Sequence, residues 1–263
     1  MMMMMMLLAC TAKQTFPSSG LEREYVLHVP DDLPDQAPLV FFLHGYRGGA
    51  RSYSWLGMKA QADALGFAVV FPQGTRDRDG VTHWNAQLDI SSTDDFAFLT
   101  GLAAALQEEH GLDPQRTYAA GISNGGFMSY ALVCHAPEVF HAAGSVIGTM
   151  SSETWESCPA APVPIFQVSG TDDEVVPIDG SMSVSGGWGG APPMSAVIAH
   201  WADVNGCTDT EPIDVGDEDT TSVRHTRCAS GDAVVYHEVA GMGHALPRWD
   251  WAGELSRFLV GLP

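Results

Sequence analysis

The chain has 263 residues, 45% of them hydrophobic, which is enough to bury the core of one α/β domain without a second domain. Its formal net charge of −20 excludes a nucleic acid or another polyanion as a plausible ligand, and its only lysines, Lys13 and Lys59, form no basic cluster for an anionic membrane surface. No apolar stretch reaches the roughly 18 residues of a membrane-spanning helix, and we expect the acidic surface to serve solubility.

The N-terminal segment resembles an export signal. Residues 7–10, Leu-Leu-Ala-Cys, have the form of a bacterial lipobox, in which the cysteine is lipidated and the preceding segment is removed. No Lys or Arg precedes Cys10 and the apolar run is short, so the alternatives are a start codon further upstream and a chance match. We expect residues 1–20 to be an export segment and polar tether, with Cys10 as the lipidated residue.

Apolar runs and helix-forming segments then alternate, which predicts a mostly parallel sheet with helices on both faces. Residues 25–29 alternate like an edge strand, whereas the continuous apolar run at 38–43 is typical of a strand buried on both faces. Residues 72–92 are expected to be a long loop, and 180–193 a flexible Gly/Ser/Pro-rich insertion. Further strands are expected at 67–71, 117–120, 142–147, 163–168 and 234–239, and helices at 53–65, from Thr93 or Asp94 to 110, at 127–133, at 196–204 and at 249–262.

The cysteines other than Cys10 predict two disulfides. Cys134, Cys158, Cys207 and Cys228 contain no C-x-x-C pair and no Cys/His spacing typical of zinc. We favour the pairing that closes the shortest loops, Cys134 with Cys158 and Cys207 with Cys228. The alternative is a cytosolic protein with reduced cysteines, but the N-terminal segment favours export.

Residues 121–125, Gly-Ile-Ser-Asn-Gly, have the G-x-S-x-G form of a nucleophile elbow, a sharp strand-to-helix turn that exposes a serine hydroxyl above a sheet. An apolar run leads into Ser123 and a helix-like segment leads out of it. Glycines flank the serine because a Cβ there would clash in so tight a turn. The motif also fits an ordinary Gly/Ser turn, and its context decides in favour of the elbow.

A serine hydroxyl needs a base to accept its proton and a carboxylate to orient that base. Ser123 is followed by acidic residues just past the strand at 163–168, and then by His244 just past the last strand, so the order Ser, acid, His is that expected for this type of fold. Asp172, Asp173 and Asp179 are the candidates for the acid. The carboxyl ends of parallel strands meet at one edge of a sheet, where these groups can converge.

Such a serine also needs an oxyanion hole. The backbone N–H of Asn124 is the expected first donor. The second is expected from the loop after the strand at 38–43, at Tyr46 or alternatively at Arg47. The alternative role for His44-Gly45 in this loop is a simple strand-ending turn.

Several segments together resemble the secreted α/β-hydrolases known as polyhydroxybutyrate depolymerases and feruloyl esterases. The resemblance runs from about residue 25 to 262 and implies that residues 21–263 form a single α/β-hydrolase catalytic domain. Within it, the G-T-x-D motif places the acid at Asp173. Ser169 and Leu246 depart from the family pattern, which has His and Trp at these positions. The matching segments are 43–49 (L-H-G-x-x-G-G), 113–126 (D-x-x-R-x-Y-x-x-G-x-S-N-G-G), 170–177 (G-T-x-D-x-x-V-P), 201–207 (W-x-x-x-N-G-C) and 243–247 (G-H-x-x-P).

The resemblance implies a serine esterase with no cofactor, acting on short polyester or oligomer substrates, or alternatively on feruloyl or acetyl esters of plant polysaccharide. Trp84, Trp188 and Trp249 are expected to line the substrate site, although each also fits simple packing. No metal-ligand spacing is present, and no obligate protein partner is evident. A membrane contact is expected only through Cys10, and the location is extracellular or periplasmic. The rival hypotheses are a serine peptidase of the same fold and a surface lipoprotein that has lost catalysis.

Overall fold

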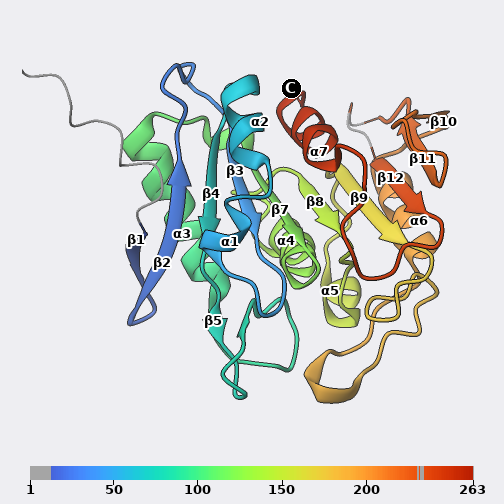
Figure 1. Cartoon of the computed structure of the whole chain (residues 1–263), viewed down its shortest axis with the longest axis horizontal. Coiled ribbons are helices and arrows are strands. Elements are labelled where there is room, and N and C mark those ends of the chain that lie inside the picture. The colour runs from blue at the N-terminus through green and yellow to red at the C-terminus, as the bar shows by residue number, and fades with distance from the viewer. Residues whose placement is uncertain (1–12, 230, 232–233, 263) are drawn as a thin grey trace, which may run out of the picture.

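The computed structural model describes residues 13–229, 231 and 234–262, so the proposed lipidation site at Cys10 lies outside the described residues. Ten strands of this part form one twisted sheet in the order β1-β2-β4-β3-β7-β8-β9-β12-β11-β10. Figure 1 shows the sheet running across the whole molecule with helices in front of it and behind it. None of the helices within these residues has the length and apolar character needed to cross a membrane.

The six central strands are parallel to one another, as the continuous apolar runs predict. Along β3, the side chains of Leu39, Phe41 and Leu43 enter one core cluster, whereas Val40 and Phe42 enter the other, because successive side chains point to opposite faces. The central strands are β3 (Leu39–Leu43), β4 (Ala68–Pro72), β7 (Thr117–Ile122), β8 (Ala143–Val146), β9 (Ile165–Gly170) and β12 (Val234–Val239).

Helices cover both faces of this sheet. The face with Leu39, Phe41 and Leu43 packs against α3 (Asp95–His110), α4 (Asn124–His135) and α6 (Met194–Val204). The opposite face packs against α1 (Ala50–Tyr53), α2 (Met58–Leu65) and α7 (Trp251–Val260). The single helix expected at 53–65 is wrong, because Gly57 in a left-handed conformation (φ 92°) separates α1 from α2.

The N-terminal edge differs from the expectation. Residues Gln14–Ser18 form β1, which pairs antiparallel with β2 (Leu21–His28), and the tether expected up to residue 20 is therefore wrong for this stretch. The ring of Phe16 lies 6.4 Å from that of Phe98 on α3, which explains how a mostly polar strand is held. The strand at 25–29 is consequently not the edge strand that we expected.

The C-terminal edge carries two strands that the sequence did not predict, β10 (Asp209–Pro212) and β11 (Thr220–Thr226), both antiparallel. The expected loop at 72–92 contains a small ribbon of β5 (Thr75–Arg76) and β6 (Thr82–His83). The remaining elements are α5 (Ser152–Ser157) and the short 3-10 helices η1 (Pro114–Arg116) and η2 (Ser185–Gly187).

Two disulfides confirm the predicted pairing. Cys134 at the end of α4 is bonded to Cys158 just after α5, and Cys207 after α6 is bonded to Cys228 after β11. The first disulfide links α4, the helix that follows Ser123, to the end of α5. The second closes the segment that carries β10 and β11.

Candidate active site

The turn between β7 and α4 holds Ser123 in an uncommon backbone conformation, with φ 53° and ψ −119°. A non-glycine residue at positive φ is strained, and such strain is concentrated at functional sites. The turn is possible because its glycines lack side chains. A Cβ on Gly121 would lie 2.4 Å from the carbonyl carbon of Gly125, and a Cβ on Gly125 would lie 2.3 Å from the backbone oxygen of Leu43.

Ser123, His244 and Asp173 form a continuous chain of hydrogen bonds. The Ser123 Oγ lies 2.9 Å from His244 Nε2, and His244 Nδ1 lies 2.7 Å from Asp173 Oδ2. Ser123 follows β7, Asp173 follows β9 and His244 follows β12, so strands far apart in sequence deliver them to the same edge of the sheet. The Asp173 side chain is 1% exposed and that of His244 is 24% exposed, so the chain runs from the protein interior to solvent.

The carboxylate of Asp173 is fixed on its other oxygen. Asp173 Oδ1 accepts hydrogen bonds from the backbone N–H groups of Val175 (2.9 Å) and Val176 (2.8 Å), leaving Oδ2 for the histidine. The other two candidates for the acid lie elsewhere. Asp172 is exposed and accepts from the Thr171 hydroxyl, and Asp179 accepts from the N–H of Ser181.

The structure bears on which backbone N–H groups could form the oxyanion hole. Asn124 opens α4, and the first N–H groups of a helix have no partner within it. Arg47 donates its N–H to Thr82 O at 2.9 Å, which removes it as an oxyanion donor. Tyr46 lines both clefts with Ser123, and no bond from its N–H to another backbone group is found in the described part of the chain, so Tyr46 and Asn124 remain the two candidates.

Ser123 and His244 lie between two clefts. The larger has a volume of about 460 Å³ and lies under the insertion at 180–193, and the smaller has a volume of about 390 Å³ and lies toward α1. Both have room for a small ester, and Tyr46 lines both. The larger cleft is also lined by Arg47, Phe127, Val175, Val176, Met182, Ser183 and Trp188, and the smaller by Gly45, Ser52, Tyr53, Leu56, Ile122, Ile147, Ala245 and Leu246.

The family model of esterase PHB depolymerases matches residues 23–214, which includes Ser123 and Asp173. The chain belongs to this family. Feruloyl esterase B from Piromyces equi is 30% identical over 84% of this chain and 42% of its own length. Poly(3-hydroxyalkanoate) depolymerase C from Paucimonas lemoignei is 29% identical over 53% of this chain and 34% of its own length. NocK from Nocardia uniformis subsp. tsuyamanensis, described as an esterase, is 30% identical over 65% of this chain, which spans 51% of that relative.

Solved structures confirm the α/β-hydrolase fold expected from the sequence. An acetyl xylan esterase from Aspergillus awamori superposes with a TM-score of 0.67 over 95% of this chain and 99% of its own, at 14% identity. The carboxylesterase of Bacillus cereus superposes with a TM-score of 0.60 over 90% and 93%, also at 14% identity. At such identities the likeness shows the shared fold.

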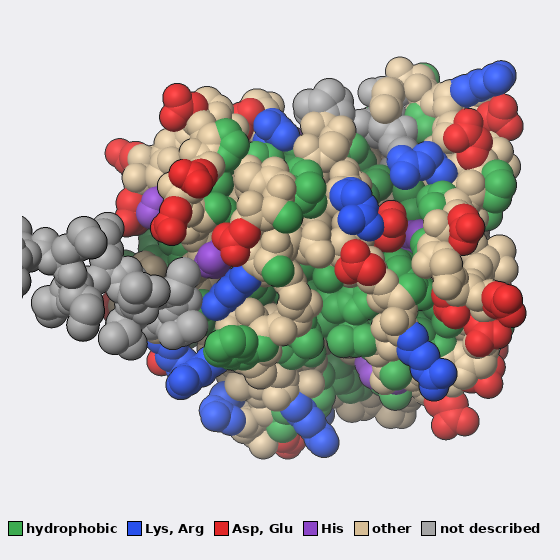
Figure 2. All heavy atoms as spheres, turned by 45° about the horizontal axis from the view of Figure 1, so that its top comes forward, with side chains coloured by type: hydrophobic (Ala, Val, Ile, Leu, Met, Phe, Trp, Pro, Cys, Tyr) green, Lys and Arg blue, Asp and Glu red, His purple; other side chains and the backbone are tan. Residues whose placement is uncertain are grey.

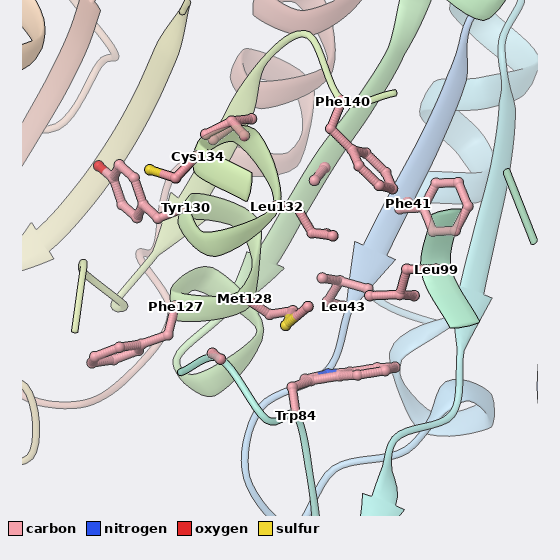
Figure 3. Close-up of a cluster of buried hydrophobic side chains, with 14 of the residues drawn as sticks. Phe41, Leu43, Trp84, Leu99, Phe127, Met128, Tyr130, Leu132, Cys134 and Phe140 are labelled. Carbon is pink, nitrogen blue, oxygen red and sulfur yellow. The ribbon is translucent and has the colours of Figure 1, made fainter. Parts of the chain in front are cut away.

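The three tryptophans expected at the substrate site of this family member have different positions. Trp188 lines the larger cleft, where its ring lies 5.1 Å from that of Tyr46, edge to face. The expectation for Trp84 is wrong, because it is fully buried behind the site, beside Leu43 and Met128 (Figure 3). Trp249 lines neither cleft and packs against the His237 ring at 4.9 Å, so that expectation is wrong as well.

Trp84 and Asn124 form a buried connection behind the elbow. The Asn124 side chain accepts from the Trp84 N–H at 2.7 Å and donates to the Trp84 carbonyl at 3.1 Å. The Trp84 indole donates to His44 O at 2.9 Å. The Asn124 side chain therefore anchors the loop at 72–92 to the elbow.

His44 lies under the site without facing either cleft. It is fully buried, its Nε2 accepts from the N–H of Gly74 at 2.9 Å, and its Nδ1 lies 2.8 Å from Gly45 O. Burial lowers the pKa of His44 to about 4, so the ring is neutral and holds two loops together.

Phe127, Val175 and Met182 also line the larger cleft, but no motif in the sequence marked them as binding residues. Within the described residues, no group of three His, Cys, Asp or Glu side chains could hold a metal ion.

Proposed function

We propose that the protein is a serine esterase in which Ser123 is the nucleophile, His244 the general base and Asp173 the residue that orients the histidine. The observation that supports it best is the hydrogen-bonded chain of these three side chains, opening onto a cleft at a strained strand-to-helix turn. Membership of the PHB depolymerase family agrees with this chemistry.

In the first half of the reaction, Ser123 Oγ attacks the ester carbonyl carbon while His244 Nε2 takes the hydroxyl proton. Asp173 Oδ2 accepts the hydrogen bond from Nδ1–H, which keeps the base in the tautomer with a free Nε2 lone pair and stabilises the imidazolium. The N–H groups of Asn124 and Tyr46 are proposed to hold the oxyanion. The ester C–O bond then breaks, and His244 returns the proton to the leaving alcohol.

In the second half, His244 removes a proton from water, which attacks the acyl-serine carbonyl. The Ser123–acyl bond breaks, the acid leaves, and the proton returns to the serine oxygen. In this proposed cycle each proton removed by His244 is returned, and no step calls for a cofactor.

For the substrate we propose short polyester or hydroxy acid oligomers, by analogy with the relative named poly(3-hydroxyalkanoate) depolymerase C. Clefts of about 460 and 390 Å³ on the two sides of Ser123 suit one short group on each side of the scissile bond. The alternative is a feruloyl or acetyl ester of plant polysaccharide, which is favoured by the relatives named feruloyl esterase and acetylxylan esterase/xylanase.

We also propose an extracellular or periplasmic location, which two disulfides support because such bonds persist in oxidising compartments. A lipid at Cys10 would anchor the protein to the cell envelope. Mass spectrometry of the protein from membranes of its native host would test this anchor.

The first experiment is hydrolysis of p-nitrophenyl acetate, butyrate and octanoate and of methyl ferulate by the wild type and by Ser123→Ala. Turnover of the short acyl esters that is lost in Ser123→Ala supports the depolymerase-like assignment. A preference for methyl ferulate moves the assignment to plant cell-wall esters. If no ester is turned over in a serine-dependent way, the esterase proposal is wrong, and the peptidase and non-catalytic hypotheses take its place.

A further inference from the structure

Arg47 is the one cationic side chain among the described residues that line the larger cleft, together with Ser123 and His244. No Asp or Glu lines this cleft in the same part of the chain. A positive group in this position is unexpected, because the whole chain has 32 acidic and only 12 basic residues. The charge lining the cleft is therefore opposite in sign to that of the protein as a whole.

The guanidinium of Arg47 has no carboxylate within 4.0 Å in the described residues. The neighbouring carboxylate of Asp77 is already satisfied: one oxygen accepts from the Tyr46 hydroxyl, and the other from the N–H groups of Asp79 and Val81. By contrast, the buried Arg23 on β2 forms an ion pair with Asp95. The guanidinium carbon of Arg47 lies 5.8 Å from the centre of the Tyr46 ring, a contact that uses none of its N–H donors. These donors thus remain for a group that enters the cleft.

The backbone of Arg47 is held in place although its side chain is exposed. Its φ of 66° lies in the left-handed region, which costs a residue with a Cβ roughly 1 kcal/mol. The N–H bond to Thr82 O and the bond from Gly48 N to Gly45 O, both 2.9 Å, keep the loop in this conformation. Glycine would fit this position without strain, so the arginine is not explained by the backbone.

Other arginines lie near Arg47 in the sequence, and the carboxylates of Asp77 and Asp79 lie among them. Arg51 on α1 and Arg76 and Arg78 on and beside β5 belong to the same short part of the sequence. Arg78 donates to Gly186 O in the insertion over the cleft at 3.5 Å, and its ion pair with Asp79 (3.8 Å) offsets its charge. In Figure 2 several basic side chains lie at the lower left, and other basic and acidic side chains are spread over the rest of this face. The positive charge that faces the cleft is therefore that of Arg47, and a positive side chain in a cleft attracts anions to it.

We propose that Arg47 is a specificity-determining residue that binds a free carboxylate on the substrate, a few bonds away from the scissile ester. The proposal rests on the esterase function and narrows its substrate to esters of hydroxy acids with an unblocked acid end. Arg47 directly follows Tyr46, the proposed oxyanion donor, so its side chain starts one residue away from the reacting carbonyl. A guanidinium binds a carboxylate through two parallel hydrogen bonds, which orients the substrate as well as attracting it.

The test uses the dimer of 3-hydroxybutyrate as the free acid and as its methyl ester, two substrates that differ in one charge. The quantity measured is kcat/KM for cleavage of the ester bond between the two hydroxybutyrate units, given as the ratio of its value for the free acid to its value for the methyl ester. In Arg47→Gln this ratio is expected to fall about 10-fold, because the substrate carboxylate loses one charged hydrogen bond that solvent partly screens. Arg47→Lys, which keeps the charge, is expected to retain most of the ratio, and 0.5 M NaCl is expected to lower it in the wild type.

Arg51→Gln is the matched control, because it removes the same charge from the same surface without changing a cleft-lining side chain. A ratio that stays within twofold of wild type in Arg47→Gln overturns the proposal. An equal fall in Arg51→Gln also overturns it, since a general field would then replace a specific contact. If the wild type hydrolyses the methyl ester through Ser123, either of these failures leaves the esterase function standing; if it hydrolyses neither ester, the esterase function fails first.

Discussion

The substitution Asp173→Asn tests the proposed relay most directly, because the structure determines which way the new amide must face. Asp173 Oδ1 accepts two backbone hydrogen bonds, from Val175 and Val176, and only the oxygen of an asparagine can accept them. The amide NH2 is therefore turned toward His244 Nδ1, which lies 2.7 Å from Oδ2 in the wild type. To accept that hydrogen bond, the imidazole must carry its proton on Nε2, and it then cannot take the proton of Ser123.

The expected effect is a loss of about 10⁴-fold in kcat, equivalent to about 5 kcal/mol, with the fold retained because the two backbone bonds survive. The assay is kcat for p-nitrophenyl butyrate, together with thermal unfolding of the same samples. The matched control is Asp172→Asn, the exposed neighbour, which is expected to keep kcat within about twofold. The reasoning is refuted if a well-folded Asp173→Asn loses less than tenfold, or if Asp172→Asn loses as much.

Three further predictions concern acid stability, a disulfide and the cleft wall. Burial lowers the pKa of His44 and of His237 to about 4, so between pH 6.5 and 4 the unfolded chain binds more protons, and the free energy of unfolding falls by about 3 kcal/mol per histidine as the pH drops. Urea titrations at pH 7, 5.5 and 4 measure this, and a flat profile would contradict it. Replacing both Cys207 and Cys228 by serine opens a loop with a sequence separation of 21, which should cost about 3 kcal/mol and lower Tm by about 10 °C; calorimetry checks it, and an unchanged Tm would show that the bond adds no stability. Trp188→Ala should raise KM for p-nitrophenyl butyrate roughly 3- to 10-fold with little change in kcat, because it removes a cleft wall but no reacting group; an unchanged KM would place the substrate elsewhere.

The elbow and the positions of the acid and histidine could be predicted from the sequence, because each depends on a short local pattern that follows a buried strand. Gly121 and Gly125 are required by contacts below 2.5 Å at the turn itself. The central strands were predictable for a similar reason. A strand buried on both faces must be apolar at every position, and the runs at 38–43 and 67–71 show this directly.

What could not be predicted depends on contacts between distant segments. The four residues of β10 are all exposed, so this strand has no apolar pattern, and only its pairing with β11 defines it. Trp84 lies in a segment without periodicity and could equally have lined a cleft. Its burial follows from hydrogen bonds to Asn124, 40 residues away, which no local pattern indicates. The absence of a carboxylate partner for the Arg47 guanidinium among the described residues likewise could not be predicted, because it depends on which acidic residues the fold brings near.

The spacing of the relay along the chain has a consequence for how activity appears during folding. His244 meets Ser123 across 121 residues and Asp173 across 71, and it reaches them only after β12 has paired with β9. Contacts closed over such long loops form late, because the entropy of loop closure must be overcome first. A chain with β7 and α4 already in place thus has a serine but no base. Ester turnover during refolding would then report the docking of the last strand, later than the recovery of helical signal.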